Sequence, residues 1–155
     1  MTVQNNIIQT GGYKMVYTEM TEKAMKIAYN AHQGQVDKSG IPYIFHPIHL
    51  AEQMETEEEC IVALLHDVVE DTDITFEQLE KEFSATVIEA LRLLTHDDSV
   101  AYMDYVRKIK NNPIARTVKL ADLWHNYDIT RMKKITKKDF RRREKYQDAI
   151  QYLTK

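Results

Sequence analysis

Apolar residues recur every three or four positions along most of the chain, and the strict alternation typical of a strand is nearly absent. The pattern is clearest in a first helix, predicted from about Thr18 or Thr21 to Gln33 and ended by Gly34. One face of this helix collects small and branched apolar residues, namely Ala24, Ile27, Ala28 and Ala31. Because the same spacing returns in later segments, we predict an all-α fold, a compact bundle of several helices.

Capping residues mark where the later helices begin. Thr56 with Glu59, and Thr75 with Gln78, have the spacing of capping boxes, in which both side chains accept hydrogen bonds from free backbone amides. The segment from Gln35 to Phe45 has no helical periodicity and is predicted to be an ordered loop. The remaining predicted helices begin at Pro47 and after Ser84, cover Val100 to about Lys110, begin again at Asn112-Pro113, and end with one from Thr136 to about Leu153.

Length and composition favour a single folded unit. A chain of 155 residues can bury about two thirds of its unfolded surface, so we predict an N-terminal extension over residues 1–17 and one domain over residues 18–155. The single cysteine, Cys60, lies in an apolar helix and is interpreted as a small buried hydrophobe. Because no segment resembles a signal peptide or a bilayer span, we expect a cytoplasmic setting and no membrane partner.

The charge of the chain argues against nucleic acid as a partner. Its formal net charge is -3, whereas proteins that neutralise several phosphates usually carry a basic excess. The one dense basic run is Arg141-Arg142-Arg143, which we interpret as the solvated face of the last helix.

Candidate chemistry lies in three separated places along the chain. They are His46 beside Pro47, the pair His66-Asp67, and Asp122. Two imidazoles and two carboxylates form a mixed nitrogen and oxygen donor set, which suits manganese, iron or zinc. Burying these acids without a cation would be costly. The pattern therefore indicates a metal-dependent hydrolase.

Helix geometry places further polar groups near this donor set. The helix that begins after Thr56 is predicted to carry the His66-Asp67 pair near its far end, with Glu70 one turn beyond His66. Asn126 lies one turn beyond Asp122. If the two helices pack antiparallel, the donors converge, and Glu70, Asn126 and the adjacent Asp71 are free for water and substrate.

At this point the sequence resembles a known family, the HD-domain metallophosphohydrolases, in particular the RelA/SpoT-type hydrolase domain and the standalone small alarmone hydrolases. The resemblance covers most of the chain and rests on four ordered motifs. They are Ala31-His32-Gln33-Gly34-Gln35, the segment from Lys38 to Pro47, the segment from Ala63 to Thr72, and Val118-Lys119-Leu120-Ala121-Asp122 with His125-Asn126.

The resemblance implies a fold, a metal and a reaction. It implies an HD-domain bundle that hydrolyses the 3′-diphosphate of guanosine tetraphosphate or pentaphosphate, with manganese as the usual metal and a nucleotide as the small-molecule partner. The implied metal ligands are His46, His66, Asp67 and Asp122, with Glu70 and Asp71 positioning or activating the attacking water. The implied substrate contacts are Lys38, Ser39, Lys119 and Asn126.

Three positions depart from the family pattern, and all three concern the substrate. Asp37 stands where the family generally has an arginine that packs beside the guanine base. Leu123 and Asp128 stand where two further arginines are usual. The implied catalytic residues are therefore intact, whereas the three positions where the family has arginines for the substrate are altered.

Two other functions stay open at this point. The chain could hydrolyse another nucleotide phosphate, or it could be a non-catalytic module that binds a metal and a nucleotide. Retention of Glu70 and Asp71 argues against the second, since a pure binder has no need of them. Among the remaining residues, we interpret Trp124 as core, His96 as exposed and His125 as structural.

Overall fold

Helices carry most of the backbone in the computed structural model, which describes residues 15–155. In chain order they are α1 (Glu19–Ala31), α2 (Phe45–Ala51), α3 (Glu57–Leu65), α4 (Val68–Asp71), α5 (Phe76–Glu80), α6 (Ala85–Leu94), α7 (Tyr102–Ile109), α8 (Pro113–Tyr127), the short 3₁₀ helix η1 (Ile129–Arg131) and α9 (Lys137–Thr154). The one β-type pairing among these residues is an isolated bridge between Val36 and Pro42. The predicted all-α fold is confirmed, and most of the predicted N-terminal extension lies outside the described residues.

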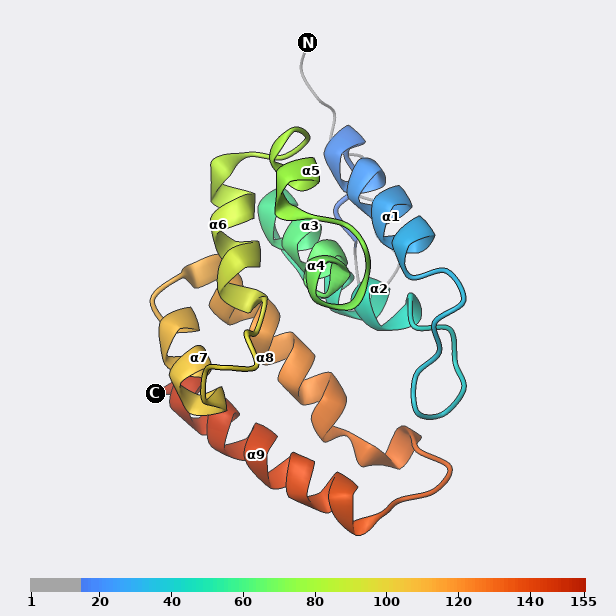
Figure 1. Cartoon of the computed structure of the whole chain (residues 1–155), viewed down its shortest axis with the longest axis vertical. Coiled ribbons are helices and arrows are strands. Elements are labelled where there is room, and N and C mark those ends of the chain that lie inside the picture. Colours follow the sequence, from blue (N-terminus) through green and yellow to red (C-terminus); the bar gives the residue numbers. More distant parts are fainter. Residues whose placement is uncertain (1–14) are drawn as a thin grey trace.

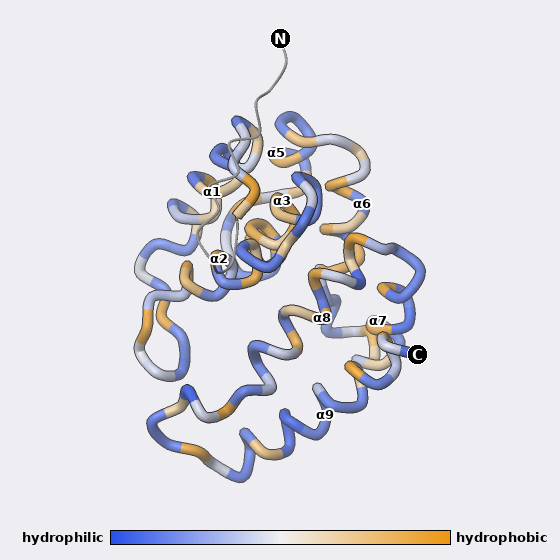
Figure 2. The backbone as a smooth tube through the Cα atoms, turned by 180° about the vertical axis from the view of Figure 1, so that it is seen from behind, coloured by the Kyte–Doolittle hydropathy of each residue, from blue (hydrophilic) through white to orange (hydrophobic). Residues whose placement is uncertain are grey.

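The elements divide into two groups around a central helix. Helix α3 packs against α1, α2, α6 and α8, while α9 packs along α8 and also contacts α7 (Figure 1). Every residue of α3 from Cys60 to Leu65 is almost fully buried, whereas α9 is largely hydrophilic along its length (Figure 2). Helix α8 therefore joins the apolar core on one side to the polar helix α9 on the other. No helix within residues 15–155 is long and apolar enough to cross a membrane.

Most predicted helix starts are confirmed by their caps. The side chains of Ser84 and Asn112 each accept a hydrogen bond from the backbone three residues ahead, and Thr75 forms the full predicted capping box with Gln78. The box predicted at Thr56 is only half formed, because Glu59 accepts from the Glu55 amide rather than from the Thr56 amide.

The two predicted boundaries that affect candidate ligands are wrong. Helix α2 begins at Phe45 rather than at Pro47, so His46 lies inside its first turn. Helix α3 ends at Leu65, so His66 caps it and Asp67 precedes α4. The physical reason is that the His66 ring lies 2.6 Å from the Ala63 carbonyl, which an uninterrupted helix would give to the Asp67 amide.

Candidate active site

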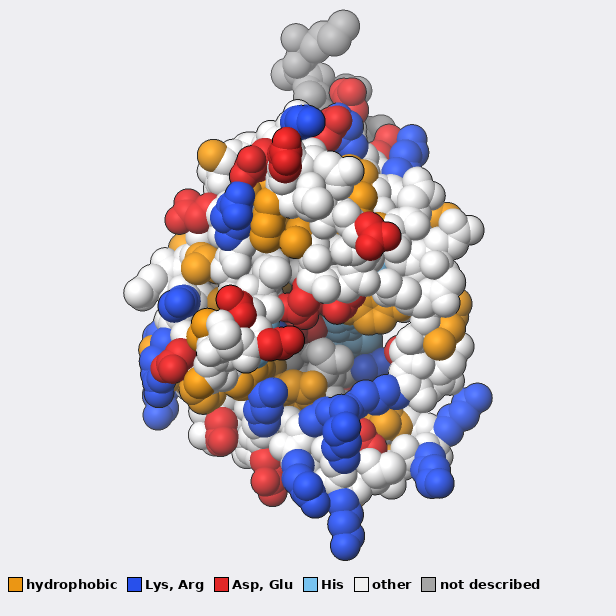
Figure 3. Space-filling model, viewed as in Figure 1, with side chains coloured by type: hydrophobic (Ala, Val, Ile, Leu, Met, Phe, Trp, Pro, Cys, Tyr) orange, Lys and Arg blue, Asp and Glu red, His pale blue; other side chains and the backbone are white. Residues whose placement is uncertain are grey.

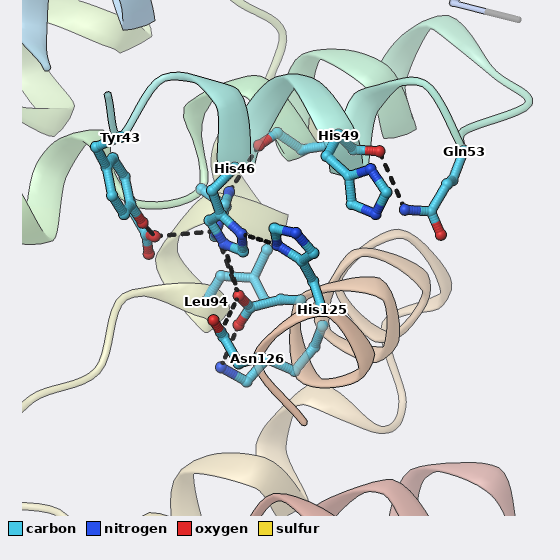
Figure 4. Close-up of polar contacts among 12 residues, drawn as sticks. Tyr43, His46, His49, Gln53, Leu94, His125 and Asn126 are labelled. Atoms are coloured by element: carbon cyan, nitrogen blue, oxygen red, sulfur yellow. Dashed lines mark hydrogen bonds and ion pairs between the residues drawn. The ribbon is translucent and has the colours of Figure 1, made fainter. Parts of the chain in front are cut away.

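Three of the candidate ligands converge in the interior between α2, α3 and α8. His46 Nε2 lies 2.9 Å and His66 Nε2 lies 3.7 Å from Asp122 Oδ1. One donor atom from each residue lies within 4.8 Å of the others. All three side chains are almost fully buried, with exposed fractions of 9%, 4% and 7% in sequence order. The packing thus brings together residues that are up to 76 positions apart, as the sequence predicted (Figure 4).

The fourth candidate ligand, Asp67, touches the same cluster. Its Oδ2 lies 3.0 Å from His66 Nε2, and it accepts a hydrogen bond from the Tyr43 hydroxyl. Burial raises the pKa of Asp67, but the neighbouring His66 lowers it to about 2. Tyr43 was missed in the sequence, because a tyrosine in a loop between Pro42 and Ile44 carries no signal that it will reach a carboxylate 24 residues away.

The His66 ring fits a metal ligand. Its Nδ1 donates to the Ala63 carbonyl at 2.6 Å, which turns Nε2 toward the other candidate ligands. Nε2 is buried and forms no hydrogen bond, although it faces two carboxylates. A histidine ligand usually donates its second ring N–H to a carbonyl or carboxylate in this way. The donor set and this unpartnered nitrogen together suit a divalent cation.

His46 is oriented by a second histidine. His46 Nδ1 lies 2.6 Å from His125 Nδ1, and the two rings stack with centroids 4.9 Å apart (Figure 4). Burial, followed by the nearby His46 and Arg131, lowers the pKa of His125 to about 3, so His125 is neutral and can accept. In that arrangement His46 donates from Nδ1 and presents Nε2 to Asp122. The contact agrees with the structural role interpreted for His125.

Two predicted substrate residues contact the candidate ligand Asp122. Lys119 Nζ lies 2.9 Å from Asp122 Oδ2, and Asn126 Nδ2 donates to Asp122 Oδ1 at 2.9 Å. Burial raises the pKa of Asp122, but Lys119, His46 and His66 hold it well below its ordinary value. Asp122 is therefore ionised and fixed from three sides.

The predicted catalytic acids form a second group beside the ligands. Donor oxygens of Asp67, Glu70 and Asp71 lie within 4.8 Å of one another, and the last two side chains are exposed. Partial burial raises the pKa of Glu70, and it also raises that of Asp71, with help from Asp67. The expectation that Glu70 is free is wrong, because its Oε1 accepts from the His96 amide at 2.7 Å. His96 is likewise half-buried rather than exposed.

A cleft of about 280 Å³ opens beside the candidate ligands. We call it the recognition cleft. Three of the four predicted substrate residues line it, namely Lys38, Ser39 and Asn126. The fourth, Lys119, lines a smaller pocket together with His66, Asp67, Glu70 and Asp122. The predicted contacts are therefore divided between two pockets that border the ligand cluster.

The acids that depart from the family pattern shape turns in the walls of the recognition cleft. Asp37 Oδ1 accepts from the Ser39 amide at 2.8 Å and from the Ile41 amide at 3.0 Å. Asp128 Oδ1 accepts from the Thr130 amide at 3.0 Å and caps η1. These are Asx-type turns, which a carboxylate stabilises and an arginine cannot.

Helix α9 contributes residues that the sequence analysis missed. Arg142 and Tyr146 line the recognition cleft, and Arg142 Nη1 lies 3.8 Å from the buried Asp139. The guanidinium of Arg143 lies over the Tyr127 ring at 4.3 Å. The interpretation of the basic run as a solvated face therefore holds for Arg141 alone, since the other two arginines are half-buried. The available signal in the sequence was that Arg142 and Arg143 lie four and three residues before Tyr146, which places all three on one side of the helix.

Comparison with known proteins places this architecture in a family. The HD domain family matches residues 24–123, more than half of the chain. The guanosine-3′,5′-bis(diphosphate) 3′-pyrophosphohydrolase MESH1 of Danio rerio is 38% identical over 122 residues, which are 70% of this chain and 68% of MESH1. A solved structure, described as a metazoan ortholog of SpoT that hydrolyses ppGpp and plays a role in starvation responses, has a TM-score of 0.71 at 26% identity and covers 90% of this chain and 87% of that one.

The chain belongs to the HD-domain family. Within that family, the resemblance to RelA/SpoT-type hydrolases is confirmed by these relatives. The chloroplastic putative GTP diphosphokinase RSH1 of Arabidopsis thaliana is 51% identical over 74 residues, and this match covers 44% of this chain but only 8% of RSH1.

Proposed function

We propose that this protein is a metal-dependent nucleotide phosphohydrolase that cleaves the 3′-diphosphate from guanosine 3′,5′-bis(diphosphate), leaving guanosine diphosphate and pyrophosphate. The observation that carries the proposal is the buried cluster of His46, His66 and Asp122 with the unpartnered Nε2 of His66. The reaction attributed to MESH1, which is similar over most of both chains, supports this substrate.

The candidate ligands would hold one divalent ion, for which manganese is our choice. These ligands are His46, His66, Asp67 and Asp122. Such an ion, when bound, lowers the pKa of water and polarises a phosphoryl oxygen. Lys119 and Asn126 keep Asp122 ionised and oriented through their contacts with its two oxygens.

Glu70 and Asp71 are proposed to position the attacking water and take its proton. Both carboxylates lie at the exposed edge of the ligand cluster, where water and substrate can enter. The raised pKa of Glu70 makes it a better proton acceptor than an ordinary carboxylate, and its bond from the His96 amide fixes one of its oxygens. The oxygen of the water forms a bond to the phosphorus, and the bond from that phosphorus to the 3′ oxygen breaks.

The recognition cleft is proposed to take the nucleoside. Lys38, Ser39 and Asn126 line it, and Asn126 reaches both the cleft and Asp122. The family's three arginines are replaced here by Asp37, Leu123 and Asp128. This replacement favours a second candidate function, hydrolysis of another nucleotide phosphate at the same metal site. A cytoplasmic location and the lack of nucleic-acid or membrane partners stay predictions.

Turnover of a nucleotide panel tests the proposal. Metal-free protein is supplied with manganese, and guanosine tetraphosphate, guanosine pentaphosphate and common nucleoside triphosphates are each assayed by chromatography. We expect guanosine tetraphosphate to be converted to guanosine diphosphate, and a chelator to stop the reaction. Hydrolysis of another nucleotide alone would select the second candidate function. Nucleotide binding without turnover of any panel member would mark a non-catalytic module.

A further inference from the structure

The charges of the chain are divided unevenly between one C-terminal segment and the rest. Residues 131–145, which we call the basic lip, hold nine lysines and arginines and two acids. The other 140 residues hold twelve lysines and arginines and twenty-two acids. A net charge of -3 therefore conceals a segment of fifteen residues with a formal charge of +7.

The basic lip borders the recognition cleft. It runs from the end of η1 through the first half of α9, and three of its charged members, Arg131, Asp139 and Arg142, line the cleft itself. In Figure 3, acidic side chains gather above the central hollow, a histidine surface is visible inside it, and lysines and arginines cover the surface below it. The cleft thus lies between an acidic wall, which carries the candidate metal site, and a basic wall.

Most of the positive charge on the basic lip is not neutralised. Two of its exposed cations are engaged, because Arg131 donates to the His125 carbonyl and Lys145 lies over the Tyr102 ring. The other exposed cations form no side-chain ion pair or hydrogen bond within residues 15–155; they are Lys133, Lys134, Lys137, Lys138 and Arg141. The carboxylate of Asp139 does not neutralise these exposed charges, because it is 7% exposed and turned inward. It accepts hydrogen bonds at 2.8 Å from both the amide and the hydroxyl of Thr136. Clustered like charges repel one another, and their usual benefit is to attract ligands of the opposite sign.

The range of this field suits capture rather than direct contact. At an ionic strength of 0.1 M, the Debye length is about 10 Å, so exposed charges beside a cleft act on an ion at its entrance but not across the protein. None of the four lysines, Lys133, Lys134, Lys137 and Lys138, lines the cleft. Any effect they have on a nucleotide must therefore come through their field.

We propose that the basic lip is an electrostatic capture surface for polyphosphate nucleotides. Its unpaired lysines raise the rate at which an anionic substrate reaches the recognition cleft, and the gain grows with the charge of the substrate. The inference rests on the proposed function and refines it, since a nucleotide with two phosphate chains is favoured over one with a single chain.

The test compares two variants with the same change in net charge. In the first, Lys133, Lys134, Lys137 and Lys138 are all replaced by Gln. In the matched control, four exposed lysines away from the cleft are replaced by Gln, namely Lys26, Lys81, Lys108 and Lys155. The steady-state parameters kcat and KM are measured with manganese and guanosine tetraphosphate at low and high salt. The association rate of a fluorescent guanosine tetraphosphate is measured separately by stopped flow.

We expect the lip variant to lose about tenfold in kcat/KM and in association rate at low salt, with kcat unchanged. The loss should shrink at high salt and be smaller for guanosine 5′-diphosphate association, and the control should match the wild type. Equal rates and equal salt dependence in the lip variant and the wild type would overturn the inference while leaving the proposed function intact. Association that depends on the basic lip, without any hydrolysis by the wild type, would support the inference and contradict the proposed function. No association with the wild type would contradict both.

Discussion

The buried wall of candidate ligands between α2, α3 and α8 and the exposed wall of the recognition cleft beside it use the same residue types in different physical settings. On the wall formed by α2, α3 and α8, charged groups are buried and each is held by the next, as in the contacts of Asp122 with His46, Lys119 and Asn126. On the wall formed by the loop before α2, η1 and α9, the carboxylates of Asp37 and Asp128 accept hydrogen bonds within turns. The lysines beside this wall are exposed to solvent. Burial fixes the identity of a charged residue, whereas exposure leaves it free to change.

This contrast accounts for two of the three departures from the family pattern, at Asp37 and Asp128; the third, Leu123, is buried, and nothing in the structure explains it. Removing one partner from a buried charged cluster leaves the remaining charges buried without a counter-charge, which lowers the free energy of unfolding by about 3 to 5 kcal/mol. An exposed arginine can be exchanged for an aspartate that stabilises the local turn instead. Asp128 is exposed and Asp37 is half-buried, and each carboxylate stabilises a turn in this way.

The largest expected effect comes from breaking the buried wall. Asp67→Asn should abolish hydrolysis and lower the bound manganese, because it removes a charged donor that faces His66. The matched control is Asp73→Asn, which changes an exposed aspartate just beyond α4. Activity and metal content are measured on the same samples. Full activity of Asp67→Asn in metal-loaded protein would remove Asp67 from the ligand set.

The next effect separates metal binding from catalysis at the edge of the same wall. Glu70→Gln should keep the metal but lower kcat by about a hundredfold, the scale expected for a positioned general base. The amide oxygen of Gln can still accept from the His96 amide, so the local structure should be preserved. Loss of metal together with activity would show that Glu70 is a ligand instead.

A pair of neighbouring substitutions sharpens the contrast between buried and exposed positions. Leu123 is 1% exposed and Trp124 is 54% exposed, so the interpretation of Trp124 as core is wrong. We expect Leu123→Ala to lower the free energy of unfolding by about 3 kcal/mol and Trp124→Ala to change it by less than about 1 kcal/mol, measured by urea denaturation. Equal losses at the two positions would contradict the assigned packing of α8.

The smallest effect concerns the turn at Asp37. Asp37→Ala removes the acceptor for the Ser39 and Ile41 amides and should lower stability by roughly 1 kcal/mol and raise KM. Asp37→Asn keeps an acceptor oxygen and should stay near the wild type in both quantities. Restoring the family arginine at this position would lose the turn, so we expect it to raise KM as well. A lower KM for Asp37→Arg would show that stacking on the base outweighs the turn.

Much of the fold follows from local signals in the sequence. The caps at Thr75, Ser84 and Asn112 act within one helical turn, so their residues alone determine them. The end of α3 could not be located in this way, because it depends on the His66 ring turning back to the Ala63 carbonyl. The full box at Thr56 failed for a similar reason, since two neighbouring amides compete for the Glu59 carboxylate.

The candidate site could be predicted only where residue type alone suggests chemistry. The histidines and acids of the three motifs are found together as predicted. The contributions of Tyr43 and Arg142 were missed, because each depends on packing between elements distant in the sequence. The basic lip was not evident from the net charge, because that number adds the charges of the whole chain and conceals a local excess of one sign.

Oxygen labelling tests the central claim most directly. Guanosine tetraphosphate is hydrolysed with manganese in water enriched in oxygen-18, and both products are analysed by mass spectrometry. If water attacks the phosphorus beside the ligand cluster, as proposed, one labelled oxygen appears in pyrophosphate and none in guanosine diphosphate. Label in guanosine diphosphate, or release of single phosphates in place of pyrophosphate, would contradict the proposed reaction.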